Sequence, residues 1–301
     1  MRYLLCLSFL LIIHTALFAQ SKIYVGIGSN IGKSAEVKDI INELTTYLSD
    51  KIGQPVYIVS PDKTSQLIEA IQESKIDIVL LNTFGYVLAA YDAPIEPLLV
   101  VSNNGNQPTS YQSCILAHVG TQITSTQMLK EKASDLVFNF VKSSSTSGHL
   151  VPRLYLNSMS LQPEYFFNDI AFAGSHYKLA EKINNGEAQV GACSYTDLQK
   201  WVTEGKLDEN NFKVIWTSKP IVNGPISVKK SLSPSNKQAI KAAFLALPKE
   251  RKELYQQLSK IWHNVQPNST LIEAQDDLYN PIREMADSME ELSILVGLYS
   301  E

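Results

Sequence analysis

Short apolar runs that alternate with helical patterns constrain the fold of this chain more than any other feature of its sequence. Runs typical of buried strands occur at 23–27, 55–59, 76–81 and 95–101. The helical pattern after the first run has one apolar face, formed by Val37, Ile40, Ile41, Leu44 and Leu48. Strands that alternate with helices predict an α/β fold with a parallel sheet and helices on both faces.

Ligands of such sheets bind at the carboxyl ends of the strands, where the loops 28–33, 60–65 and 82–86 would gather. A polar connector, residues 102–110, then leads into a second series of elements. Its expected strands are 111–117, 135–141, 170–176, 188–195, 212–216 and 226–228. Helices are expected near 125–133, 150–158, 178–183, 198–201, 234–247, 249–261 and 281–297. A chain of 301 residues is long enough for two lobes.

The first 19 residues have the parts of a secretory signal peptide. Arg2 supplies a positive charge, an apolar run extends from Leu4 to Ile13, and small residues precede Gln20. The apolar run is too short to span a bilayer. We therefore expect cleavage beside Ala19 or Gln20 and a soluble protein that is periplasmic or secreted.

The acidic balance of the chain disfavours a nucleic-acid partner. Loss of Arg2 with the signal peptide leaves 25 of the 26 basic residues against 30 acidic ones, a net charge of −5. Nucleic-acid binding calls for a basic face. A small anion stays compatible, because backbone N–H and hydroxyl groups hold anions without a positive net charge.

A hydroxyl-rich turn, residues 142–152 with the sequence KSSSTSGHLVP, lies between an expected strand and an expected helix. The first turn of a helix has unpaired N–H groups and a partial positive charge. Ser145, Thr146 and Ser147 add hydroxyls, and Gly148 lets the backbone approach a ligand. The turn is a candidate anion site. The alternative is an ordinary helix cap, because Ser and Thr are common at helix starts.

Cysteine usage and the absence of known motifs argue against an enzyme or a disulfide scaffold. Only Cys114 and Cys193 remain after export, and they either pair or stay as small buried residues. The sequence has no Gly-x-Ser-x-Gly elbow, no His-Glu-x-x-His pattern and no paired-Cys metal signature. We expect no catalytic residue, no cofactor and no metal.

Four stretches of the chain resemble the phosphate/phosphite/phosphonate-binding proteins, the periplasmic substrate-binding components of ABC importers. The most specific stretch is 145–152, which matches the family signature Ser-Thr-Ser-Gly-x-Leu-Val-Pro in register. The others are 75–79 with Gly85 and Tyr86, 172–176 with its Gly-Ser-His loop, and 214–218 with 224–226. The resemblance covers nearly the whole mature chain.

This resemblance implies a two-lobed periplasmic-binding-protein fold of type 2, with the ligand cleft between the lobes. Lobe 1 would consist of residues 22–107 and 221–301, and lobe 2 of residues 108–220. The protein would capture a small oxyanion, close its lobes around it and present it to an ABC permease. We expect a monomer that needs no cofactor.

The resemblance also implies a set of binding residues. Hydroxyls and helix-start N–H groups would hold the anion at Ser145, Thr146 and Ser147. His176 would donate to the same oxygens, and its partial protonation would add charge near neutral pH. Donors from lobe 1 are expected at Thr64, Asn82, Thr83 and Tyr86. The alternative for these side chains is ordinary helix capping or a structural loop contact.

Departures from the family pattern narrow the expected ligand. Family members that bind aminoethylphosphonate have aromatic residues at the positions that match Thr64 and Leu81 here, and acidic residues that hold the amino group. The corresponding stretches read Ser-Tyr-Thr at 194–196 and Asn-Gly at 223–224, with Asp197 as the nearest carboxylate. An unpaired buried ammonium costs several kcal/mol. The expected ligand is therefore phosphate, phosphite or a small alkylphosphonate.

Two other functions stay open at this stage. The same fold serves sensing when the closed lobes engage a membrane receptor instead of a permease. An exported hydrolase would use a hydroxyl nucleophile with His176, or Cys193 with a histidine. A cysteine among small residues at the end of a strand is more often part of the core.

Overall fold

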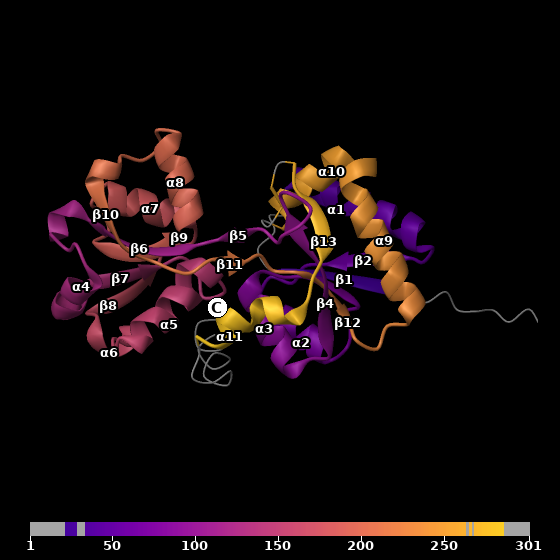
Figure 1. Cartoon of the computed structure of the whole chain (residues 1–301), viewed down its shortest axis with the longest axis horizontal. Helices are drawn as coiled ribbons and strands as arrows, with labels where there is room; N and C mark the ends of the chain where they lie inside the picture. Colours follow the sequence, from indigo (N-terminus) through magenta and orange to yellow (C-terminus); the bar gives the residue numbers. More distant parts are fainter. Residues whose placement is uncertain (1–21, 29–33, 263–264, 267, 286–301) are drawn as a thin grey trace, which may run out of the picture.

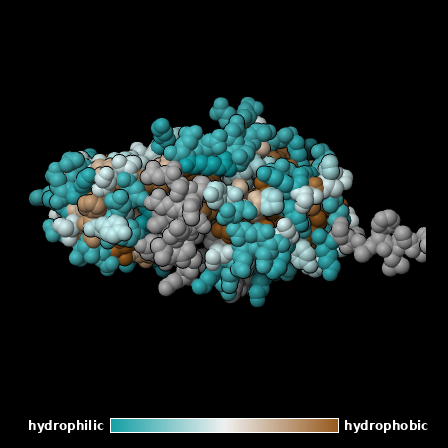
Figure 2. Space-filling model, turned by 90° about the horizontal axis from the view of Figure 1, so that it is seen from below, coloured by the Kyte–Doolittle hydropathy of each residue, from teal (hydrophilic) through white to brown (hydrophobic). Residues whose placement is uncertain are grey.

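The computed structural model describes residues 22–28, 34–262, 265–266 and 268–285. It shows an α/β protein with two separate sheets, joined by a two-stranded connection (Figure 1). The expected signal peptide, residues 1–19, and residues 286–297 of the expected last helix lie outside the described residues. One face of the molecule is mostly hydrophilic, with small hydrophobic patches (Figure 2). No helix within the described ranges is both long and apolar enough to cross a bilayer.

Strands from both ends of the chain form the six-stranded sheet, in the order β13-β4-β12-β3-β1-β2. They are β1 (Ile23–Ile27), β2 (Val56–Val59), β3 (Ile78–Leu80), β4 (Ile95–Ser102), β12 (Ile226–Lys229) and β13 (Thr270–Glu273). β1 pairs in parallel with β2 and β3, but β12 and β13 run antiparallel to their neighbours. The sequence predicted a parallel sheet, and the sheet is instead mixed, because β12 enters without the preceding helix that a parallel crossover needs.

Helices cover both faces of this sheet. Their bounds are α1 (Ala35–Ile52), α2 (Thr64–Gln72), α3 (Thr83–Asp92), α9 (Pro234–Glu250), α10 (Lys252–Gln257) and α11 (Asn280–Arg283). Residues of α1, α9 and α10 pack in one apolar cluster, and residues of α2, α3 and α11 pack in another. α1 begins where the Ser34 side chain accepts from Val37 N–H (3.3 Å), and it ends at Gly53, whose φ of 72° suits glycine.

The middle of the chain forms the five-stranded sheet, in the order β10-β6-β9-β7-β8. Its strands are β6 (Ser113–His118), β7 (Val137–Phe140), β8 (Asp169–Phe172), β9 (Val190–Ser194) and β10 (Phe212–Thr217). Its helices are α4 (Thr126–Lys132), α5 (Val151–Ser158), α6 (Pro163–Phe166), α7 (His176–Asn184) and α8 (Tyr195–Thr203). Two apolar clusters account for its core.

Two short strands join the sheets. β5 (Ser110–Tyr111) and β11 (Ile221–Val222) pair antiparallel and lie between the two sheets (Figure 1). The chain thus leaves the six-stranded sheet along β5 and returns along β11. The lobe boundaries 22–107, 108–220 and 221–301 stay a prediction.

The C-terminal part differs most from the sequence-based expectations. β13 lies at 270–273, where no strand was expected, and its pairing with β4 holds it in place. α10 ends at Gln257 and a single 3₁₀ turn extends to Lys260. Of the helix expected near 281–297, only residues 281–285 are described, and there α11 ends at Arg283 and a turn follows.

Candidate functional site

The hydroxyl-rich turn after β7 adopts a π-helical turn at Thr146–Leu150, directly before α5. Leu150 N–H donates to Ser145 O (3.0 Å), five residues back. The Ser145 hydroxyl caps the turn by accepting from Gly148 N–H (3.0 Å). A side chain at position 148 would overlap Val141, so the tight path of the turn requires glycine. Such π-turns are frequent at functional sites.

The start of α3, from the six-stranded sheet, meets this turn. Asn82 caps α3 by accepting from Gly85 N–H (2.7 Å), and its amide donates to Ser144 O (2.9 Å). Phe84 N–H, in the first turn of α3, donates to the Thr146 hydroxyl (3.1 Å). The N-termini of two helical segments, one next to each sheet, therefore point toward one place. Their partial positive charges favour an anion there.

Tyr111 of β5 belongs to the same cluster of donors and was not expected from the sequence. Burial raises the pKa of its phenol, and interactions with the side chains of Thr146 and Thr83 act against that rise, which indicates that the three side chains lie close together. Thr83 also donates to Val222 O of β11 (2.6 Å). The only signal in the sequence was a tyrosine directly after the polar connector.

His176 is the first residue of α7, rather than a loop residue as expected. Its Nδ1 accepts from Ser194 N–H (2.9 Å), so the neutral ring carries its proton on Nε2. Nε2 lies 3.4 Å from the Ser145 hydroxyl. The charge expected from partial protonation of His176 stays a prediction.

Buried contacts hold the hydroxyl-rich turn from behind. The Ser113 hydroxyl of β6 donates to Ser147 O (2.6 Å). His149 Nε2 accepts from Arg153 Nε (2.9 Å), so its Nδ1 donates to Ser143 O (2.7 Å). Burial, with Arg153 as the next cause, lowers the pKa of His149 to about 4. Arg153 in turn forms an ion pair with Glu164 of α6. The turn is thus anchored at two carbonyl groups by neutral donors.

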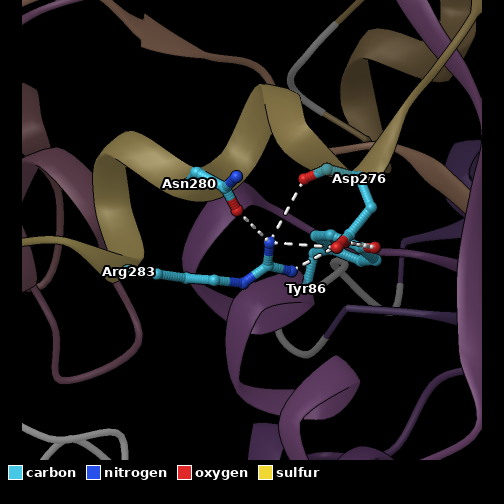
Figure 3. Close-up of polar contacts among 4 residues, drawn as sticks. All are labelled: Tyr86, Asp276, Asn280 and Arg283. Carbon is cyan, nitrogen blue, oxygen red and sulfur yellow. Dashed lines mark hydrogen bonds and ion pairs between the residues drawn. The ribbon is translucent and has the colours of Figure 1, made fainter.

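Tyr86, one of the residues expected at the site, bonds outside this cluster. Tyr86 donates to Asp276 (2.5 Å), and Asp276 forms an ion pair with Arg283 of α11 (2.7 Å), as Figure 3 shows. Burial and Asp276 raise the pKa of Tyr86. Thr64 is the first residue of α2, and its side chain lies outside the described part of the structure.

Acidic residues would be needed at 194–197 or 223–224 to hold an amino group. The contacts described there direct no carboxylate toward the cluster. Asn223 is buried and donates to the Thr109 hydroxyl (2.6 Å). Asp197 is exposed in the first turn of α8, and its charge is the weakest of the effects on the pKa of Tyr111. Among the described residues, no group of three or more His, Cys, Asp or Glu side chains could hold a metal ion.

The chain forms two sheets that are joined by two short strands. Helix starts next to both sheets meet at a set of neutral donors. This arrangement defines a two-lobed periplasmic binding protein of the type 2 fold. Comparisons with known proteins agree. The family described as "ABC transporter, phosphonate, periplasmic substrate-binding protein" matches residues 32–279. The chain belongs to this family, which confirms the resemblance and the expected fold.

Individual relatives are distant. The Phosphonates-binding periplasmic protein of Escherichia coli (strain K12) is 26% identical over 212 residues, which span 69% of this chain but only 62% of that protein. A solved binding protein component of an ABC phosphonate transporter from Pseudomonas aeruginosa has 22% identity and a TM-score of 0.67, over 92% of this chain and 89% of that chain. PhnD1 from Prochlorococcus marinus (MIT 9301), solved in complex with methylphosphonate, has 18% identity and a TM-score of 0.64, over 88% and 96%.

Proposed function

We propose that this protein captures a small phosphorus oxyanion, namely phosphate, phosphite or an alkylphosphonate, for an ABC importer. Its two lobes, residues 22–107 with 221–301 and residues 108–220, would close around the ligand after export and removal of residues 1–19. The hydrogen bond from Phe84 N–H to the Thr146 hydroxyl carries the proposal. It joins the starts of two helical segments, one from each sheet, at the point where an anion would be most stable.

The donors at this point suit the oxygens of a tetrahedral anion. In our proposal, hydroxyls and N–H groups of 145–147, the Nε2–H of His176 and the hydroxyl of Tyr111 bind the ligand. The Thr83 hydroxyl would join them on releasing Val222 O. A ligand oxygen would take the place of the Thr146 hydroxyl at Phe84 N–H. Asn82 would hold the lobes together through Ser144 O. Tyr86 would brace α3 instead of binding the ligand, and Thr64 stays a predicted contact.

The ligand class follows from the neutral character of these donors. They stabilise negative oxygens, whereas an aminoalkyl ligand needs a carboxylate beside its ammonium group. Asn223 is engaged with Thr109, and Asp197 is exposed. The methylphosphonate in the Prochlorococcus relative supports an oxyanion with a short apolar substituent.

Titration calorimetry tests the proposal on mature protein that has been unfolded and refolded to remove any bound ligand. Phosphate, phosphite, methylphosphonate and 2-aminoethylphosphonate are compared. Thr146→Ala with Ser147→Ala should weaken binding of the preferred anion about 10- to 100-fold, because hydrogen bonds to charged groups are lost. Thr203→Ala is the matched control, since Thr203 is exposed and its hydroxyl donates to Gln199 O of the same helix. Unchanged affinity in the double variant, or tightest binding of the aminated compound, would contradict the proposal.

A receptor-linked sensor would use the same site, and the membrane partner separates the two roles. Loss of oxyanion uptake on deletion of the gene supports import.

The hydrolase alternative has less support. In a catalytic triad the histidine Nδ1–H donates to a carboxylate, whereas the Nδ1 of His176 accepts from the Ser194 N–H. Cys193 is buried, and contact with Cys114 and burial raise the pKa of its thiol.

A further inference from the structure

Two buried cysteines face each other in the five-stranded sheet. Cys114 of β6 and Cys193 of β9 are direct partners in this antiparallel pair. Their Sγ atoms are 3.7 Å apart, and neither residue has exposed surface. The two thiols are 79 positions apart in the chain, so the folded sheet brings them together.

The pairing register gives these cysteines a backbone separation that suits a disulfide. Tyr195 N–H donates to Gln112 O (2.8 Å), which makes that couple a hydrogen-bonded one. Hydrogen-bonded couples alternate along an antiparallel ladder, so Cys114 and Cys193 form the next one, with Cα atoms about 5.5 Å apart. Disulfides bridge Cα separations of about 4.4–6.8 Å. Rotation of the two side chains can therefore join the sulfurs without moving the strands.

The neighbouring residues connect this pair to the candidate anion site. Ser113, directly before Cys114, donates its hydroxyl to Ser147 O. Ser194, directly after Cys193, donates its N–H to His176 Nδ1. Ser113 and Ser194 are themselves register partners. The spacing between β6 and β9 at the cysteines therefore sets the positions of Ser147 and His176.

We propose that Cys114 and Cys193 form a disulfide in the exported protein, and that this bond holds β6 and β9 at the spacing that positions Ser147 and His176. The family is periplasmic, and disulfides form and persist in that compartment. The effect of the bond on ligand binding, through the positions of Ser147 and His176, rests on the proposed function. The formation of the bond itself is independent of that function.

The chemistry balances with a disulfide-bearing oxidant of the exporting compartment. Each thiol gives up one proton, two electrons pass to the oxidant disulfide, and one S–S bond forms while the oxidant becomes two thiols. In the folded, reduced protein, the Cys114 contact and burial raise the pKa of the Cys193 thiol well above its usual range. The reactive thiolate is therefore scarce once the sheet has formed. Oxidation accordingly takes place while the chain folds.

A thiol count tests bond formation without any ligand. The mature chain is purified from a bacterial periplasm and, in parallel, from a reducing cytoplasm, and both samples are denatured and treated with maleimide. The exported sample should take up no label. Its intact mass should be about 2 Da lower than that of the reduced, unlabelled chain, because two hydrogens are lost. The cytoplasmic sample should take up two labels. Two labels on the exported sample would overturn the proposal.

Amide exchange tests the structural link to the site, again without ligand. Wild-type protein is compared in its oxidised form and after reduction in denaturant and refolding with reductant. Exchange in segments 113–118 and 190–195 should rise about tenfold on reduction, and the melting temperature should fall by about 5–10 °C. Equal exchange in both forms would overturn the positional half of the proposal.

Affinity for methylphosphonate should fall at least about fivefold on reduction, because the donors are less well positioned. Equal affinity in the two forms would contradict the coupling to the site. Absence of binding by both forms would refute the proposed function, while the thiol count and the exchange data would still decide for or against the disulfide. Wild-type protein serves in all three experiments, so a poorly folding cysteine variant cannot obscure the result.

Discussion

At the scale of single residues, two histidines have their ring protons fixed by neighbours in opposite ways. Nδ1 of His176 accepts from Ser194 N–H, which leaves Nε2–H as the donor beside Ser145. Nε2 of His149 accepts from Arg153, which leaves Nδ1–H as the donor to Ser143 O. Each ring therefore directs one N–H donor, one at the candidate site and one behind it.

The first prediction separates the two ring nitrogens of His176. Glutamine places its amide nitrogen near the position of Nε2, whereas asparagine replaces only the Nδ1 side of the ring. Methylphosphonate affinity should fall about threefold in His176→Gln and about 30-fold or more in His176→Asn, since a donor to a charged ligand is lost only in the latter. Calorimetry at pH 7 measures both. Equal losses would show that the orientation of the ring does not matter for binding.

The second prediction concerns acid sensitivity from His149. Its folded-state pKa of about 4 lies below the ordinary value of 6.5, so between these pH values the unfolded chain binds a proton that the folded protein excludes. Stability should therefore be fully present above pH 6.5 and fall by about 3 kcal/mol as the pH drops to 4. Urea unfolding across this range measures the slope. His149→Gln should flatten it, and an unchanged slope in that variant would assign the effect elsewhere.

The sequence signature predicted some contacts of the candidate site but not others, for a physical reason. Thr146 and the start of α3 were expected because helix starts and capping residues are local features of the sequence. Tyr111 was missed, since nothing local indicates that a residue in the connection will reach hydroxyls from both sheets. Tyr86 was expected at the site, but its partner Asp276 lies 190 positions away.

At the scale of elements, the C-terminal segment braces α3. Tyr86 of α3 donates to Asp276, which pairs with Arg283 of α11 (Figure 3). The rings of Tyr86 and Tyr279 lie 4.6 Å apart. Tyr279 also donates to Asn223 O, beyond β11 (3.1 Å). The helix whose first turn meets the hydroxyl-rich turn is thus held at its next turn by residues from the far end of the chain.

The third prediction follows from this brace. Tyr86→Phe keeps the ring and removes the hydroxyl that bonds to Asp276. The free energy of unfolding should fall by about 1 kcal/mol, because the hydrogen bond is only partly buried and the Asp276 side chain is 58% exposed. Affinity for methylphosphonate should change less than about twofold, because the hydroxyl is outside the donor cluster. Urea unfolding and calorimetry give the two numbers. A large loss of affinity with unchanged stability would instead place the Tyr86 hydroxyl at the ligand.

Elements were predictable where local patterns decide them and unpredictable where distant partners do. The capped, amphipathic α1 was expected from its own residues. β13 is four residues long and exists through its pairing with β4, so its short alternation was not sufficient as a signal. The antiparallel entry of β12 likewise depends on the path of the chain between sheets, which no local pattern contains.

At the scale of the whole molecule, the net charge opposes the proposed ligand. The full chain has a formal charge of −4, and the proposed site uses neutral donors and helix starts. Long-range attraction from excess positive charge cannot then guide an anion to the site. Short-range hydrogen bonds would provide both affinity and selectivity.

The fourth prediction uses salt to test this arrangement. Screening by salt weakens the repulsion between an acidic protein and an anion. The association rate for methylphosphonate should therefore stay constant or rise by up to about twofold between 20 and 500 mM sodium chloride. Over roughly this range the Debye length shrinks below 5 Å. Stopped-flow measurements of intrinsic tryptophan fluorescence supply the rate. A rate that falls several-fold with salt would indicate steering by a positive patch.

The two joining strands have a consequence for how such a protein could evolve. Tyr111 of β5 touches Thr83 and Thr146, and Thr83 holds Val222 of β11, so both strands contribute atoms to the place where the ligand is proposed to sit. A substitution that alters how easily the molecule bends at these strands would alter its selectivity as well. Adaptation to a new solute and retuning of the bending motion would therefore have to arise together.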